Sequence, residues 1–162
     1  MDENIQKSFF GKLLKKLNED NSKIEIGNLA PYFEIKESRG QTISNYAIYA
    51  NYTLIQFWAS WCASCQKENI YWSKINNQNM AKGLAILGVS LDKNKKDWLE
   101  AIKKDKLNWL HGSQLQGWDS KVVDLYNIQS IPYNVLIDRF GKIVAKDLRG
   151  RALNDELNKI LK

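Results

Sequence analysis

The most apolar parts of the chain are two short runs that flank a helical pattern. Residues 53–59 read Thr-Leu-Ile-Gln-Phe-Trp-Ala, a run of β-branched and aromatic residues typical of a strand buried on both faces. Residues 63–79 have the length and periodicity of a helix, and residues 84–91 predict a second buried strand. Together they predict a β-α-β unit, which the right-handed crossover rule places in a parallel sheet.

Weaker patterns predict further elements on both sides of this unit. Residues 32–36 alternate as a strand, and residues 41–43 return as its hairpin partner after Ser38-Arg39-Gly40. Beyond the unit, after an inserted stretch, two helices, a hairpin and a closing helix are expected in this order: 97–104, 119–126 with Asp119 or Ser120 near its N-cap, 133–138 paired with 142–146, and 153–161.

The first residues predict an amphipathic helix over 5–17, because Ile5, Phe9, Leu13 and Leu17 recur at helical spacing with lysines between them. Packing against this domain or a neighbouring piece of chain is favoured over a membrane-surface role, since the segment is short and its polar face is mixed. We therefore divide the chain into an N-terminal helix and loop, residues 1–22, and one domain, residues 23–162.

Composition supports a single globular domain. The 162 residues are 44% hydrophobic and 26% charged, and they include only two prolines. Lysines scattered along the chain account for most of the net charge of +6, and no nucleic-acid motif accompanies them, so we expect no nucleic-acid partner. The chain shows no apolar run of membrane-spanning length and no signal peptide, which taken alone predicts a cytoplasmic protein.

The two cysteines, Cys62 and Cys65, are three residues apart and lie where the first buried strand passes into the helix. Backbone N–H groups and the helix dipole stabilise an anion at a helix start, so Cys62 should form a thiolate more readily than a free cysteine does. Cys65, one turn further and deeper, can then close a ring. A zinc site, an inert disulfide and two ordinary buried thiols are the alternatives; zinc is disfavoured because only His111 and carboxylates remain as further ligands.

Glu68 belongs to the same helix as the cysteines. Cys65, Glu68, Trp72 and Ile75 follow steps of three, four and three, so they share one stripe of the helix. We expect Glu68 to be partly buried, with a raised pKa suited to exchanging protons with Cys65. An exposed glutamate on a slightly rotated helix is the alternative.

The other tryptophans and the histidine have simpler expectations. Trp58, Trp61, Trp72 and Trp118 are expected mostly in the core, with Trp61 helping to cover Cys62. His111 is expected on the surface, in a polar loop.

Two distant motifs resemble the TlpA/ResA-like thioredoxins of bacteria. The first is Phe-Trp-Ala-Ser-Trp-Cys-Ala-Ser-Cys-Gln-Lys-Glu over 57–68, and the second is Ile-Pro-Tyr-Asn-Val-Leu-Ile-Asp over 131–138. The resemblance runs from about residue 26 to the C-terminus. It implies an α/β thioredoxin fold, whose central mixed sheet is flanked by helices, with an N-terminal helix and β-hairpin and a β-α insertion.

The resemblance also implies a site and a setting. Ile131 and a cis Pro132 would form the wall on which substrate backbone docks, beside Trp61, and Glu68 would carry protons. No metal and no cofactor would be needed. The protein would lie outside the cytoplasm, periplasmic or anchored to the outer side of the inner membrane, with protein disulfides as substrates and a membrane thiol-disulfide donor as partner.

Three positions depart from the general thioredoxin pattern. Gln56 stands where those proteins carry a buried aspartate, Ala63-Ser64 replaces Gly-Pro between the cysteines, and Ile70 replaces a helix proline. The lost aspartate leaves Glu68 as the nearby proton carrier.

Three hypotheses for function follow. The first is a thiol-disulfide oxidoreductase in which Cys62 attacks and Cys65 resolves. The second is a peroxiredoxin-like peroxidase, disfavoured because Ala59 stands where that chemistry uses a Thr or Ser. The third is a redox-silent interaction domain, against which the intact cysteines speak.

Overall fold

The structure is a computed structural model, and it describes Lys12, Leu13 and residues 24–162. Lys12 and Leu13 are helical. The rest of the segment 1–22 lies outside the described residues, so the amphipathic helix over 5–17 stays a prediction.

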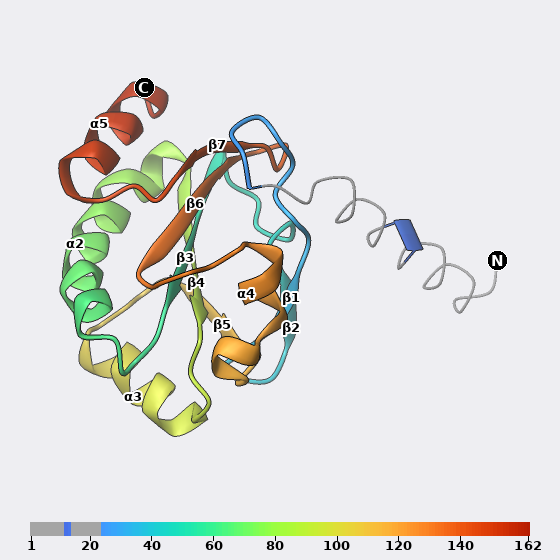
Figure 1. The fold of residues 1–162 in the computed structure, drawn as a ribbon. Coiled ribbons are helices and arrows are strands. Elements are labelled where there is room, and N and C mark those ends of the chain that lie inside the picture. The colour runs from blue at the N-terminus through green and yellow to red at the C-terminus, as the bar shows by residue number, and fades with distance from the viewer. Residues whose placement is uncertain (1–11, 14–23) are drawn as a thin grey trace.

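A seven-stranded mixed sheet forms the centre of the described part of the chain (Figure 1). Its spatial order is β2-β1-β5-β4-β3-β6-β7. The parallel pairs are β3 with β4 and β4 with β5, and the other neighbours are antiparallel. The strands in chain order are β1 Glu34–Glu37, β2 Thr42–Ser44, β3 Tyr52–Trp58, β4 Leu84–Ser90, β5 Leu110–Ser113, β6 Tyr133–Asp138 and β7 Ile143–Lys146.

Helices cover both faces of this sheet. Figure 1 shows α2 and α5 on one side and α4 on the other. The helices are α2 Ala63–Asn79, α3 Lys95–Lys104, α4 Lys121–Leu125 and α5 Gly150–Ile160, with short 3-10 helices at Met80–Lys82 and Gly117–Asp119. The predicted β-α-β unit is confirmed as β3, α2 and β4, and the insertion before α4 contains α3 and β5.

Strand β3 is buried on both faces, which explains its continuous apolar sequence. Leu54 packs with Trp72 of α2 and Leu153 of α5, in one core cluster. Ile55 and Phe57, which alternate with Leu54 along the strand, belong to a second cluster, together with residues of α3 and α4. Each of these fully buried side chains contributes about 1.5–3 kcal/mol by leaving water.

The prediction that His111 lies in a surface loop is wrong. His111 is only 6% exposed and belongs to β5, a strand that sequence patterns did not indicate. Its imidazole contacts the rings of Trp58 and Trp109, with centroid distances of 5.5 and 5.3 Å. The residue opposite on β4 is Gly88, where a Cβ would lie 2.2 Å from Nδ1 of His111, so the glycine makes the space that the ring fills.

The expected burial of four tryptophans is also only half right. Trp58 and Trp72 are fully buried, but Trp61 and Trp118 are 56% and 44% exposed. Trp118 belongs to the 3-10 helix before α4, and its ring centroid lies 6.4 Å from that of Trp61. These two indoles contact each other at the surface, and neither packs into the core.

Burial of His111 predicts a loss of stability in acid. Burial lowers its pKa from 6.5 to about 3. Between these pH values His111 is protonated in the unfolded chain and neutral in the native state. We expect the free energy of unfolding to fall by about 3–5 kcal/mol from this residue as the pH falls from 6.5 to 3. Urea unfolding across this range measures it. The His111→Gln variant should show a shallower fall with pH, and equal slopes would contradict the prediction.

Candidate active site

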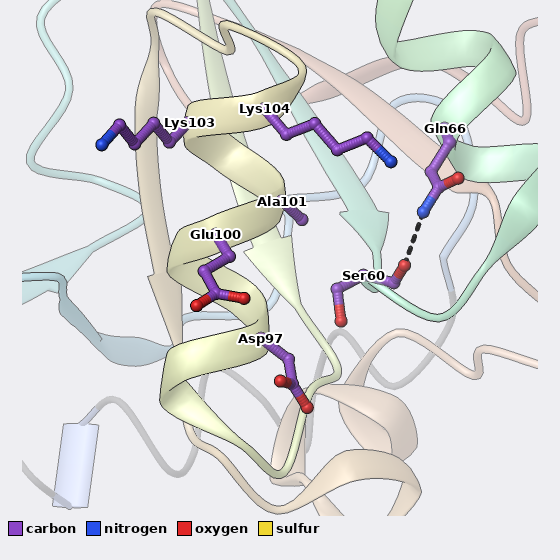
Figure 2. A pocket seen from close by; sticks show the side chains of 7 residues that line it. All are labelled: Ser60, Gln66, Asp97, Glu100, Ala101, Lys103 and Lys104. Carbon is purple, nitrogen blue, oxygen red and sulfur yellow. Dashed lines mark hydrogen bonds between the residues drawn. The ribbon is translucent and has the colours of Figure 1, made fainter.

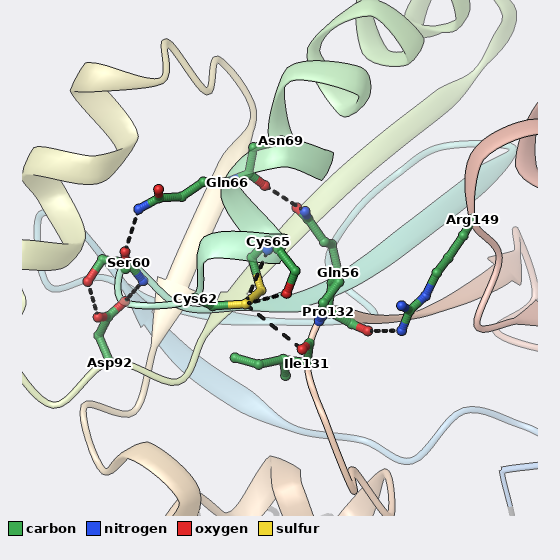
Figure 3. Close-up of a disulfide and its surroundings, with 11 residues drawn as sticks. Gln56, Ser60, Cys62, Cys65, Gln66, Asn69, Asp92, Ile131, Pro132 and Arg149 are labelled. Atoms are coloured by element: carbon green, nitrogen blue, oxygen red, sulfur yellow. Dashed lines mark hydrogen bonds between the residues drawn. A yellow bond between two sulfur atoms is a disulfide. The ribbon is translucent and has the colours of Figure 1, made fainter.

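Cys62 and Cys65 stand at the junction of β3 and α2, joined as a disulfide with a Cα–Cα distance of 5.2 Å (Figure 3). Cys62 is the N-cap of α2, and its sulfur accepts the backbone N–H of Cys65 at 3.2 Å. The first turn of the helix contains no acidic residue. The helix start therefore offers its N–H groups to an anion on Cys62.

The two sulfur-bearing residues differ in access. Cys62 retains 7% exposure, whereas Cys65 is fully buried, as the sequence predicted from its place one turn inside the helix. A disulfide partner from outside therefore reaches the sulfur of Cys62 first.

The segment 131–132 faces the disulfide from the start of β6. The carbonyl oxygen of Ile131 lies 3.9 Å from the Cys62 sulfur, and the Ile131–Pro132 peptide bond is cis. Antiparallel pairing sets Phe57 of β3 opposite Tyr133 of β6, so the end of one strand lies beside the start of the other. The expected cis bond and its proximity to Cys62 are both confirmed.

Glu68 lies one turn beyond Cys65 and is half-buried, as expected from the stripe that it shares with the buried Trp72. Its Oε2 atom is buried and accepts no hydrogen bond of normal geometry from the described residues. Burial raises the pKa of this carboxyl; the positive charge of Arg149 and the nearby indole of Trp72 oppose the rise, and the negative charge of Asp147 adds to it. The carboxyl is thus held closer to the protonated state than an exposed glutamate would be.

Gln56 occupies the position where thioredoxins carry a buried aspartate, and it is buried here too. Its Nε2 donates to Oδ1 of Asn69 on α2 at 2.8 Å. The strand register places Asn134, Gln56, Gly88 and His111 in one row across β6, β3, β4 and β5. The two amides that meet beneath α2 are neutral, and Glu68 is the only carboxyl that this helix carries.

Asp92 supports the loop before Cys62, a role that sequence reasoning missed. This buried carboxylate accepts the backbone N–H of Ser60 at 3.0 Å, and it accepts the hydroxyls of Ser60 and Ser90 as well. A signal existed, because Asp92 follows the carboxyl end of β4, and the carboxyl ends of parallel strands are where functional polar groups gather. The contact holds the segment leading into the cysteine pair.

Arg149 was also missed. Its Nη2 donates to the carbonyl of Pro132 at 2.6 Å, from the residue that precedes α5 (Figure 3). The two residues are 17 positions apart and share no periodic pattern, so no local signal in the sequence could have joined them.

A family model described as the AhpC/TSA family matches residues 26–146. The chain belongs to this family. The thiol-disulfide oxidoreductase ResA of Bacillus cereus is 26% identical over 127 residues, which cover 78% of this chain and 72% of the relative.

Two solved structures extend the comparison. A thiol-disulfide oxidoreductase from Bacteroides fragilis NCTC 9343 matches with a TM-score of 0.78 and 36% identity, covering 83% of this chain and all (100%) of that one. The thioredoxin domain of a thiol-disulfide oxidoreductase from Bacteroides vulgatus matches with a TM-score of 0.80 and 34% identity, over 86% of this chain and 100% of that chain. The protein is accordingly a TlpA/ResA-like thiol-disulfide oxidoreductase with a thioredoxin fold.

A pocket of about 640 Å³ lies beside the active-site loop of this TlpA/ResA-like protein. Figure 2 shows Ser60 and Gln66 on one side and residues of α3 on the other. The side chain of Gln66 donates to the carbonyl of Ser60 at 2.7 Å. Two acidic and two basic side chains balance the charge of the α3 wall: Asp97, Glu100, Lys103 and Lys104. In the view of Figure 3, the disulfide lies between Ser60 and Pro132.

The difference in access predicts an order of alkylation. After reduction, Cys62 should react with iodoacetamide roughly tenfold faster than Cys65 or more, because the Cys65 sulfur is enclosed and that of Cys62 faces the helix start. Brief labelling followed by peptide mass spectrometry measures both sites. The Cys62→Ser variant is the control and should label slowly; preferential labelling of Cys65 in the parent would reverse the assignment.

Proposed function

We propose that Cys62 is the attacking thiol and Cys65 the resolving thiol in disulfide exchange with protein substrates. The observation that carries this proposal is the position of Cys62: its sulfur caps α2 and lies 3.9 Å from the carbonyl of Ile131. An anion is stabilised there and a substrate chain has backbone polar groups to pair with.

The exchange moves two electrons in two steps. The Cys62 thiolate attacks one sulfur of a substrate disulfide, that S–S bond breaks, and the other substrate sulfur leaves as a thiolate that takes up a proton. Cys65 then gives up its proton and attacks the Cys62 sulfur, which releases the second substrate thiol. The dithiol has become the Cys62–Cys65 disulfide, and the substrate disulfide has been reduced. The same steps in reverse oxidise a substrate dithiol.

Glu68 is the proposed proton carrier for Cys65. Cys65 is fully buried, so its thiolate forms in a site that disfavours new charge. The carboxyl of Glu68 has a pKa raised by burial, and this brings its proton affinity nearer to that of a thiol. A carboxylate there can take the proton when Cys65 attacks.

Ile131, Pro132 and Trp61 form the proposed docking surface for substrate. Ile131 presents its carbonyl toward Cys62, and Pro132 precedes the first residue of β6. Trp61 is exposed directly before Cys62 and can cover an incoming chain with its indole ring. A polypeptide that reaches the Cys62 sulfur between these residues would pair its backbone with the 131–132 segment.

We place this activity outside the bacterial cytoplasm, with a membrane thiol-disulfide protein as electron donor and an anchored full-length form. The support is the similarity to ResA proteins, such as those of Bacillus cereus and Bacillus subtilis. Within the part of the chain that the structure describes, no helix is long and apolar enough to cross a bilayer.

Trapping tests the roles of the two cysteines. Cys65→Ser should accumulate mixed disulfides with substrate proteins, because the attack occurs but the resolving thiol is lost. Cys62→Ser should accumulate none. Non-reducing electrophoresis after reaction with an oxidised protein, with and without dithiothreitol, measures both. Trapping through Cys65 instead would overturn the proposal.

Replacement of Glu68 tests the proton route. Glu68→Gln should slow the resolving step near neutral pH by roughly 100-fold, the lower end of the range for general acid-base catalysis. In the parent, the rate should fall as the pH drops through the raised pKa of Glu68, since the protonated carboxyl cannot accept a proton. The variant should lack that acid limb.

Stopped-flow reduction of a disulfide peptide across pH gives both profiles. Glu156→Gln is the matched control, because Glu156 lies on α5 and pairs with Lys159 in its own helix. Superimposable profiles for Glu68→Gln and the parent would show that the proton leaves by another route.

A further inference from the structure

The turn between β7 and α5 reaches the active site through Arg149. Figure 3 shows its guanidinium extended from this turn to the carbonyl of Pro132, where Nη2 donates at 2.6 Å. The same nitrogen lies 3.3 Å from Oδ1 of Asp147, as an ion pair. Arg149 thus connects the Ile131–Pro132 segment beside Cys62 to the carboxylate of Asp147.

The turn itself is fixed to β6 by the buried amide of Asn134. Its Nδ2 donates to the carbonyl of Leu148 at 2.8 Å, and the N–H of Leu148 donates back to its Oδ1 at 3.1 Å. The N–H of Asp147 donates to the backbone carbonyl of Asn134 at 2.8 Å. Asn134 follows Pro132 by two residues, so these hydrogen bonds hold the turn in register with the segment that Arg149 contacts.

The Pro132 contact is a charge-assisted hydrogen bond. A guanidinium presents several N–H groups in a rigid plane, so one side chain can serve the carbonyl and Asp147 together. A carbonyl held in this way fixes the orientation of the peptide unit that begins β6. Displacement of that unit would move the Ile131 carbonyl, which lies 3.9 Å from the Cys62 sulfur.

Charged groups from the turn act on Glu68. Arg149 opposes the rise in its pKa and Asp147 adds to it. Tyr133, on β6, faces the same region: its pKa is raised by burial and further by the charge of Asp147. Of these groups, Arg149 supplies the positive charge that favours an ionised Glu68.

We propose that Arg149 is a positioning residue of the active site: through its hydrogen bond to the Pro132 carbonyl it orients the Ile131–Pro132 segment for substrate. A secondary effect of its charge on Glu68 rests on the proton route proposed above. The positioning does not depend on that route.

Two variants separate these effects. Arg149→Gln removes both the charge and the planar fork, so the acid limb of the resolving step should move to higher pH. KM for a disulfide peptide should rise roughly threefold to tenfold, because the Pro132 carbonyl loses its charged donor. Arg149→Lys keeps the charge but not the fork, so the pH profile should return while KM is restored only in part.

Arg151→Gln is the matched control, because Arg151 lies two residues away, is almost fully exposed and pairs within α5 with Asp155. It removes the same charge from the protein and should leave the pH profile and KM unchanged. Thermal unfolding of all variants shows whether the fold is retained, and Arg149→Lys carries the test if Arg149→Gln unfolds.

A double variant distinguishes this inference from the function on which it rests. In a Glu68→Gln background, Arg149→Gln should no longer shift the pH profile but should still raise KM.

If Glu68→Gln alone leaves the pH profile unchanged, the proton route is wrong, and so is the charge effect of Arg149 on Glu68. If Glu68→Gln behaves as expected while Arg149→Gln matches the parent in pH profile and KM, the inference about Arg149 is wrong. Equal effects from Arg151→Gln would overturn it as well.

Discussion

The antiparallel register between β3 and β6 is the constraint on which the active site depends. With Phe57 opposite Tyr133, the end of β3 that leads to Cys62 and the start of β6 after Pro132 lie at the same end of the sheet. A slip of one residue would turn every side chain of β6 to the other face, so the core packing that buries Val135 and Leu136 on opposite sides also holds the register. Stability of the core and geometry of the site are therefore one property.

The interior near the cysteines is polar but uncharged along one row of the sheet. Asn134 and Gln56 use their amides to bind a turn and a helix, and His111 is kept neutral by burial. Charged groups act instead on the half-buried Glu68 of α2, whose pKa is affected in opposite directions by Arg149 and Asp147. Solvent can still exchange protons with the half-buried Glu68, whereas the amides of Asn134 and Gln56 in the sheet beneath carry no charge at any pH.

Sequence patterns anticipated the elements that have local causes. The bounds of α2 matched the helical periodicity, and β3 and β4 followed from runs of residues buried on both sides. The cysteine pair was equally local, since a helix start defines its chemistry.

Features made by distant parts of the chain were not anticipated. The strand β5 has only four residues, Leu-His-Gly-Ser, and its histidine packs against Gly88 on β4 and Trp58 on β3, which are distant in the chain. The contact of Arg149 with Pro132 depends on a turn that is held from another strand. The resemblance supplied Pro132, which its own neighbours in the chain would not have singled out.

The close approach of Gly88 and His111 also bears on how this sequence can change over generations. A methyl group at position 88 would overlap the imidazole, whose nearest nitrogen is 2.2 Å from the place of a Cβ. A larger residue at 88 fits only if the imidazole moves or is replaced by a smaller side chain, and loss of the histidine leaves a space beside the glycine. Substitutions at positions 88 and 111 are therefore coupled.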